Sequence, residues 1–312
     1  MPRHISFMFP GQGSQHLGML DDNLKKLFNI HKNEINDSLG FNLMDIIDNG
    51  PIEDLNRTSI TQPAILTTSV AILTVLKNEF NLKISDIKYF AGHSLGEYTA
   101  LVASESLKFS DALHLVHNRG KLMQSAVPLG KGAMLAVMGL NIIELNSMLK
   151  KNEFVKGICE VANDNSPGQI IISGEKETLM DFSGKLKAEK RKSIFLPVSA
   201  PFHCSLMKPA AESMKKLLEK IVFRNPITKV VSNVTALPIE KEINIKDLLY
   251  RQIFSQVRWR ESVEYMIKNN VNDFIEIGPG KVLSGLVKRT NDNVSTKSIN
   301  KIEDMKIYND KS

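Results

Sequence analysis

Short apolar segments alternate with longer segments of helical character along the first 130 residues of the chain. Strand-like runs at Ile5 to Phe9 and Tyr89 to Ala91 are separated by a long helical region from about Leu17 to Asn49 and a second one from Gln62 to Glu79, and another follows from Glu97. Strands that alternate with helices are typical of a mainly parallel sheet covered by helices. We therefore predict an α/β fold here.

A different order begins near Gly130. It reads strand, helix, strand, strand, helix, strand, at Ala133 to Met138, Ile142 to Lys150, Gly157 to Ala162, Gln169 to Ser173, Thr178 to Glu189 and Ser193 to Val198. This is the ferredoxin-like order. We predict a small ferredoxin-like subdomain over residues 129–199, inserted into a large α/β-hydrolase-like catalytic domain formed by residues 1–128 and 200–312.

The alternation of strand-like and helical segments resumes after His203. The segments are a helix, a strand, two helices, a strand and a helix, at Met207 to Ile221, Lys229 to Ser232, Ile245 to Phe254, Glu261 to Asn269, Asp273 to Ile277 and after Gly280. A polar tail follows from Thr290 to Ser312, and we expect its last part to be poorly ordered.

Composition narrows the class of protein. A chain of 312 residues with 42% hydrophobic residues can bury a large core, and its net charge of +6 comes without a basic and aromatic cluster that would indicate nucleic-acid binding. No apolar run approaches ~18 residues, and no signal-peptide pattern opens the sequence. We expect a cytoplasmic protein that uses neither membrane nor nucleic acid. Cys159 and Cys204 lack metal-ligand spacing, so we expect no zinc site and no disulfide framework.

The main candidate for chemistry is the Gly-x-Ser-x-Gly run from Gly92 to Gly96. It follows a strand-like stretch and precedes a helical one, which is the context of a nucleophile elbow. Ser94 is therefore the candidate nucleophile, and peptide N–H groups at the following helix can stabilise an oxyanion. An ordinary glycine-rich turn with a capping serine is the alternative.

A second glycine-rich loop, Gly11-Gln12-Gly13, follows the opening strand. Its backbone can approach a ligand closely, so its N–H groups could face the nucleophile. A phosphate-binding loop is the other interpretation, but the Gly-Lys-Ser/Thr ending of a Walker-type site is missing. A plain turn also remains open.

A base and a cation complete the candidate set. His203 lies on a short loop bounded by Pro201, and a serine nucleophile needs a general base. His93 would point away from the hydroxyl of Ser94, and Cys204 is interpreted as a bystander thiol. Arg119 presents a planar fork that can hold a carboxylate by two hydrogen bonds, although a surface ion pair is its ordinary role.

Taken together, these blocks resemble the bacterial malonyl-CoA:acyl carrier protein transacylases of type II fatty acid synthesis. The resemblance covers nearly the whole chain. It is carried by Gly11 to Gln15, Gly92 to Tyr98, Arg119, Asn163 to Gln169, Pro201 to Cys204, Gln252 and Gly278 to Leu283.

The resemblance implies a ping-pong transfer of malonyl from malonyl-CoA to the phosphopantetheine thiol of holo acyl carrier protein, with no metal or redox cofactor. In it, Ser94 is the nucleophile and His203 the base. The peptide N–H groups of Gln12 and Leu95 form the oxyanion hole, and Arg119 pairs with the free carboxylate of malonate.

Three further positions follow from the same resemblance. A main-chain carbonyl near Gln252 orients the histidine in place of a carboxylate. Phe202 restricts a 2-methyl branch, and the loop from Asn163 to Gln169 lines the cleft between the subdomains, a structural turn being equally plausible. Gly278 to Gly280 is interpreted as a turn that sets the fold. We further expect a monomer that docks its acidic carrier through basic residues.

Two other function classes share some of these features. An α/β-hydrolase has the same elbow, but its histidine lies near the C-terminus, whereas His203 has about a hundred residues after it. Arg119 also argues against a neutral ester. A non-catalytic carrier-binding scaffold is the second class, and the presence of Ser94, His203 and Arg119 argues against it.

Overall fold

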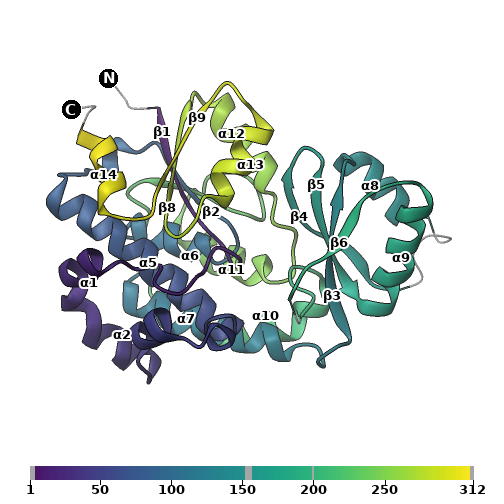
Figure 1. Cartoon of the computed structure of the whole chain (residues 1–312), viewed down its shortest axis with the longest axis horizontal. Coiled ribbons are helices and arrows are strands. Elements are labelled where there is room, and N and C mark those ends of the chain that lie inside the picture. The colour runs from purple at the N-terminus through teal and green to yellow at the C-terminus, as the bar shows by residue number, and fades with distance from the viewer. Residues whose placement is uncertain (1–3, 152–156, 199, 310–312) are drawn as a thin grey trace.

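Two β-sheets divide the described part of the molecule into a large and a small lobe (Figure 1). The computed structural model describes residues 4–151, 157–198 and 200–309. The sheet of the large lobe is parallel throughout, in the order β7-β2-β1-β8-β9. Its strands are β1 (Ile5–Phe9), β2 (Tyr89–Gly92), β7 (Lys229–Val231), β8 (Asp273–Ile277) and β9 (Ser295–Ile299).

Helices cover this parallel sheet, as the alternating pattern predicts. They are α1 (Asp22–Phe28), α2 (Lys32–Leu39), α3 (Leu43–Asn49), α4 (Ile52–Leu55), α5 (Thr58–Glu79), α6 (Gly96–Ala103), α7 (Phe109–Ser125), α10 (Lys208–Leu218), α11 (Ile245–Gln252), α12 (Trp259–Lys268), α13 (Val282–Thr290) and α14 (Ile302–Asn309). Short 3₁₀ turns lie at Asn29–His31, Ile84–Asp86, Ser205–Met207 and Glu242–Asn244.

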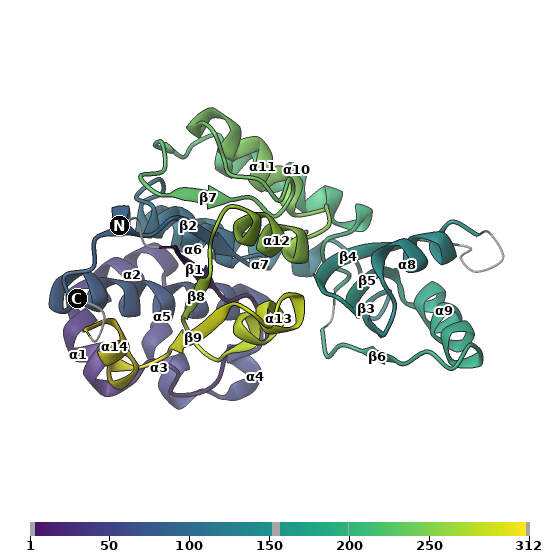
Figure 2. The same ribbon diagram turned by 90° about the horizontal axis from the view of Figure 1, so that it is seen from above.

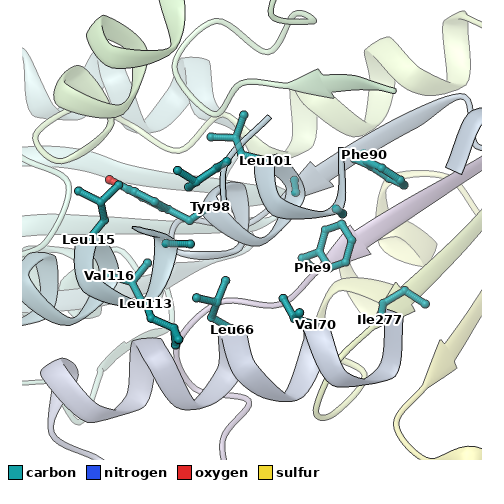
Figure 3. Packing of buried hydrophobic residues seen from close by; sticks show 14 of the residues in the cluster. Phe9, Leu66, Val70, Phe90, Tyr98, Leu101, Leu113, Leu115, Val116 and Ile277 are labelled. Carbon is teal, nitrogen blue, oxygen red and sulfur yellow. The ribbon is translucent and has the colours of Figure 1, made fainter. Parts of the chain in front are cut away.

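The centre of the core is α5, which is apolar on all sides. It is long and apolar enough to span a membrane by length and composition, but 83% of its apolar window is buried inside the protein. Figure 3 shows Leu66 and Val70 of α5 beside Phe9 of β1 and side chains of α6 and α7. A helix that is hydrophobic all round is the expected core helix of a large domain.

The small lobe holds the second sheet, which is antiparallel. Its chain order is β3 (Gly132–Met138), α8 (Ile142–Leu149), β4 (Cys159–Ser166), β5 (Gln169–Glu175), α9 (Lys176–Ala188) and β6 (Ser193–Phe195), and the strand order is β4-β5-β3-β6. The predicted combination of a parallel sheet with a separate antiparallel sheet is confirmed. We propose that this lobe corresponds to the inserted subdomain of residues 129–199.

Both helices of the small lobe lie on the face of its sheet that is turned away from the large lobe (Figures 1 and 2). Residues of β3 and β5 alternate accordingly. Leu135 and Ile172 pack in the core under α8 and α9, whereas Met134 and Ile171 belong to the main core. The second face of the small sheet is thus available to build a site against the large lobe.

The structure differs in detail from the sequence-based predictions in three places. The helical region from Leu17 to Asn49 is three helices, because Gly40 ends α2 in a left-handed conformation (φ 77°) and Asn42 caps α3 with its side chain. The loop from Asn163 to Gln169 is largely strand, since Asn163 and Asp164 pair with Ile171 and Ile170 despite their polarity.

The third difference is in the tail. Residues 295–299 form β9, an edge strand whose half-exposed side chains hide the strand pattern, and Met305 anchors α14 in the core. Residues 310–312 lie outside the described part of the chain.

The lobes are joined along β4. Asp164 donates its N–H to the carbonyl of Val257 (3.0 Å), and Val257 donates to the carbonyl of Ala162 (2.8 Å). The carboxylate of Asp164 is 1% exposed and accepts three hydrogen bonds from the guanidinium of Arg260 on α12. These bonds fix the small sheet at the carboxyl edge of the large one.

Candidate active site

A sharp turn between β2 and α6 presents Ser94 at the carboxyl edge of the parallel sheet. Ser94 has a positive φ of 53°. A Cβ on Gly92 would lie 1.9 Å from the carbonyl of Gly96, and one on Gly96 would lie 2.1 Å from the carbonyl oxygen of Phe9. Only glycine fits at both positions, so the motif is a nucleophile elbow in structure as well as in sequence.

His203 contacts the serine hydroxyl directly. Its Nε2 lies 2.8 Å from Ser94 Oγ, and its Nδ1 lies 2.9 Å from the main-chain carbonyl oxygen of Gln252. Because a carbonyl can only accept, Nδ1 carries the proton and Nε2 is free to accept one from the serine. Burial, with the charge of Arg119 as the second cause, lowers the pKa of His203 to about 3. The ring is therefore neutral near physiological pH, as a general base must be.

Arg119 on α7 lies beside the same hydroxyl. Its side chain is 1% exposed, and its Nη2 donates to Ser94 Oγ (3.0 Å) and to Gln252 Oε1 (2.9 Å), while Nη1 donates to Gln62 Oε1 (2.8 Å). Its Nε has no hydrogen-bond partner, and no carboxylate among the described residues lies within 4 Å of the guanidinium. A buried cation without an ion pair is suited to an incoming anion.

Two buried residues of the large lobe, Asn233 and Glu97, are hydrogen-bonded to the backbone of Ser94 and to the side chain of Gln252. Asn233, in the turn after β7, accepts the N–H of Ser94 through Oδ1 (2.8 Å). Glu97 on α6 accepts from the side chain of Gln252 (2.7 Å) and from the N–H of Asn233 (3.1 Å). Burial raises the pKa of Glu97 to about 7. We call Glu97, Arg119, Asn233 and Gln252, together with Gln62, the polar floor.

The sequence alone did not indicate Asn233. It lies outside every motif, in the turn that follows a short strand, and its role depends on β7 being the sheet neighbour of β2. Glu97 lies inside the elbow motif, but no sequence pattern assigned a role to its side chain. The polar side chain that follows a neighbouring parallel strand is the signal that could have found Asn233.

The predicted oxyanion donors belong to the same cavity as Ser94. Gln12 and Leu95 both line the cavity, and Leu95 immediately precedes α6. The N–H groups of Gly96, Glu97 and Tyr98 donate to carbonyls of the elbow. The N–H of Leu95 has no protein acceptor among the described residues, so it is available for a ligand.

The cavity above Ser94 has a volume of about 470 Å³ and is lined by both lobes. Asn163 and Phe202 are among the residues that line it. We use the name apolar wall for the apolar residues that line the cavity from the small lobe and from the segment that leaves it: Met134, Ile171, Leu196, Pro197, Val198 and Phe202.

The remaining candidates take other places. His93 contacts the side chain of Asn165 through Nε2 (2.9 Å), and the thiol of Cys204 donates to the carbonyl of Pro201 (3.1 Å). Burial raises the pKa of that thiol to about 11. Gly278 and Gly280 have positive φ in the turn between β8 and α13. The described residues hold no cluster of three side chains that could bind a metal ion.

This geometry has the parts of a covalent acyl-transfer site. A hydroxyl touches a neutral imidazole, N–H groups are available nearby, and a buried guanidinium lies within hydrogen-bond distance of the hydroxyl. An unpaired buried guanidinium at this place favours an acyl group that carries its own negative charge.

Comparison with known proteins agrees with an acyl-transfer site. Residues 6–307 match the family model described as acyl transferase domain. Malonyl CoA-acyl carrier protein transacylases from Escherichia coli strain K12 and Bacillus subtilis are 42% and 41% identical to this chain, over 95% and 97% of it and 96% and 95% of their own lengths.

Solved structures agree as well. An acyl carrier protein S-malonyltransferase from Vibrio cholerae superposes with a TM-score of 0.92 at 39% identity, covering 97% of this chain and 99% of its own. A malonyl-transacylase in complex with its holo type II PKS acyl-carrier protein superposes with a TM-score of 0.91 at 39% identity and covers 99% of both chains.

Proposed function

This chain belongs to the family of malonyl CoA-acyl carrier protein transacylases, and we propose from that premise which of its residues carry the reaction. The enzyme moves the malonyl group of malonyl-CoA to acyl carrier protein for fatty acid synthesis. The proposal concerns the two half-reactions at Ser94 and the recognition of malonate.

In the first half-reaction, Ser94 Oγ attacks the thioester carbonyl and its proton passes to His203 Nε2. The N–H groups of Gln12 and Leu95 receive the negative charge that develops on the carbonyl oxygen. Collapse of the tetrahedral intermediate breaks the C–S bond, and His203 returns the proton to the departing CoA thiolate. A malonyl ester remains on Ser94.

The second half-reaction reverses these roles for the new acceptor. His203 takes the proton of the phosphopantetheine thiol, sulfur attacks the malonyl ester, and Ser94 leaves as the hydroxyl. Gln252 keeps the imidazole in one tautomer through its main-chain carbonyl, which lies 2.9 Å from Nδ1. A neutral acceptor at this position holds the ring without adding a second negative charge to the site.

Arg119 selects the acyl group. Its buried guanidinium, 3.0 Å from Ser94 Oγ through Nη2, is the observation that carries the proposal. Malonate brings a second carboxylate that can form a charge-assisted pair there, and acetate does not. Phe202 limits a branch at C2 of the acyl group, and Asn163 contributes a polar edge to the same cavity.

Other properties of the chain belong to the same proposal. It acts as a monomer in the cytoplasm, with no membrane and no nucleic acid as partner. Basic residues near the mouth of the cavity contribute to docking of an acidic carrier. A salt-dependent KM for the carrier, together with a salt-independent KM for malonyl-CoA, supports this docking mode, and equal salt responses exclude it.

The test of the proposal is intact mass spectrometry after brief mixing with malonyl-CoA. We expect a malonyl adduct on the parent enzyme and none on the Ser94→Ala variant, with Ser14→Ala, which changes another serine of the cavity lining, as the matched control. An adduct that persists in the Ser94→Ala variant would place the nucleophile elsewhere.

A further inference from the structure

Asn233 connects three parts of the nucleophile elbow. Its side-chain Oδ1 accepts the N–H of Ser94 (2.8 Å), and its Nδ2 donates to the carbonyl of Gly92 (2.7 Å), the last residue of β2. Its own N–H donates to Glu97 Oε2 (3.1 Å) in the first turn of α6. One side chain and its backbone thus hold the strand end, the nucleophile and the helix start.

The elbow needs such an external partner. Ser94 has a positive φ of 53°, a conformation that residues other than glycine adopt only with strain. Its N–H lies between a strand that has ended and a helix that has not begun, so neither supplies an acceptor. A strained conformation persists only where its surroundings fix it, and Asn233 provides both an acceptor and a donor for that purpose.

Asn233 is itself held firmly. It is 1% exposed, and its carbonyl accepts the N–H of Arg258 (3.0 Å). It lies in the turn that follows β7, and β7 pairs in parallel with β2. The carboxyl ends of neighbouring parallel strands share one edge of a sheet, which explains how a residue 139 positions away in sequence reaches Ser94.

We propose that Asn233 is a positioning residue that sets the conformation of the nucleophile elbow and thereby the reactivity of Ser94. It is not among the cavity-lining residues of the described chain, so it acts through Ser94 and not through the substrate. The inference rests on the proposed role of Ser94 as nucleophile.

The first prediction concerns the Asn233→Ala variant. The Ser94 N–H and the Gly92 carbonyl lose their partners, and the hydroxyl moves relative to His203 and the oxyanion donors. A displacement of about 1 Å in such a site lowers the rate about 10²-fold. We expect the rate of acyl-enzyme formation to fall about 10- to 100-fold for malonyl-CoA and acetyl-CoA alike, with KM for malonyl-CoA unchanged.

The equal loss with both donors separates this role from that of Arg119, whose removal affects malonyl alone. Asn225→Ala is the matched control, since the side chain of Asn225 also accepts a backbone N–H, from Glu242 (3.1 Å), but at an exposed site. We expect the control to react at the parental rate.

The Asn233→Asp variant gives a readout that loss of packing cannot produce. A protonated aspartic acid has one carbonyl oxygen and one O–H, so it can accept from Ser94 and donate to Gly92 as asparagine does. An ionised one can accept but not donate, and it would oppose the carbonyl of Gly92. The variant should therefore work in its protonated form only.

The groups around position 233 determine the pKa of the aspartic acid in the Asn233→Asp variant. Burial and the carboxylate of Glu97 on α6 raise the pKa of an acid placed there. The guanidinium of Arg258, next to α12, is paired with Glu261. The charge of Arg119 acts on this position only indirectly, because its guanidinium is hydrogen-bonded to Gln252. His203, whose pKa burial lowers to about 3, stays neutral throughout the test. Glu97, whose pKa burial raises to about 7, is present in both the parent and the variant, so the ratio of their rates removes its own contribution.

The deciding experiment is rapid-quench mass spectrometry of malonyl loading by the parent, Asn233→Ala and Asn233→Asp enzymes. We expect the ratio of the Asn233→Asp rate to the parental rate to rise at least about fivefold between about pH 8 and about pH 6. A constant ratio, or an Asn233→Ala enzyme that loads at the parental rate, overturns the inference. Absence of an adduct on the parent enzyme would instead contradict the proposed function, so the two failures are distinct.

Discussion

The polar floor and the apolar wall meet at Ser94 but are built in opposite ways. The floor comes from the large lobe, and each of its members is tied to another by hydrogen bonds, as in the chain from Glu97 through Gln252 to Arg119. The wall comes from the small lobe and its exit segment, and its members, such as Met134 and Phe202, contribute shape without polar contacts to the floor. The floor is suited to set rates and, through Arg119, to bind the charge of malonate, whereas the wall is suited to limit the bulk of the acyl group that enters.

We expect the largest effect on rate at His203, which contacts the hydroxyl of Ser94 and lies next to the polar floor. The His203→Ala variant loses the proton acceptor of the hydroxyl, and we expect the rate of acyl-enzyme formation to fall about 10³-fold or more. His114→Ala, which changes an exposed helix position, is the control. Rapid-quench measurement decides, and a loss below about tenfold would mean that another group takes the proton.

Arg119 should show the second largest effect, and only with one donor. Removal of a buried charge-assisted hydrogen bond lowers transition-state stabilisation by about 1.5–3 kcal/mol. We expect Arg119→Ala to reduce malonyl loading about 10- to 100-fold while sparing acetyl loading. Parallel assays with the two CoA esters measure the ratio, and an equal loss with both would identify a structural arginine.

Phe202 tests the wall. Phe202→Ala enlarges the cavity beside the acyl group, and discrimination by packing of one methyl group amounts to about 1–3 kcal/mol. We expect the preference for malonyl-CoA over methylmalonyl-CoA to fall about tenfold with kcat for malonyl-CoA little changed. A large drop in kcat without a change of preference would place Phe202 with the floor.

The smallest effect concerns stability. Because burial raises the pKa of Glu97 to about 7, the folded protein holds a proton that the unfolded chain releases above its ordinary pKa of 4.5. The contribution of protonated Glu97 to the free energy of unfolding is fully present below pH 4.5 and is lost as the pH rises through 7.

Glu97→Gln removes this titration. We expect the free energy of unfolding of the variant to gain on that of the parent by on the order of 1–3 kcal/mol between about pH 4.5 and about pH 8. Urea unfolding at both pH values measures the change. A pH-independent difference would mean that the carboxyl stays ionised.

Much of the fold and of the candidate site could be predicted from the sequence, and the parts that could not be predicted were missed for physical reasons. The motif located the elbow, because it depends on local spacing. The residue types of His203 and Arg119 made them candidates, and the resemblance to the transacylases implied their roles. The parallel and antiparallel sheets also followed from element order. Asn233 could not be found, because its contact with Ser94 depends on which strands are neighbours in the sheet.

The errors in local structure have the same origin. Polar residues such as Asn163 and Asp164 form strand β4 because their partners come from β5 and from α12, which the local pattern does not contain. The edge strand β9 was missed because its side chains are only half buried. In each case tertiary contacts outweigh the local sequence signal.

The most direct test of the account is the fate of the isolated malonyl-enzyme. The floor and the wall together should direct the acyl group to a thiol and away from water. On mixing with holo acyl carrier protein, we predict that malonyl-carrier forms far faster than free malonate appears when the carrier is omitted. Release of malonate at a comparable rate with and without carrier would contradict the account and indicate a hydrolase.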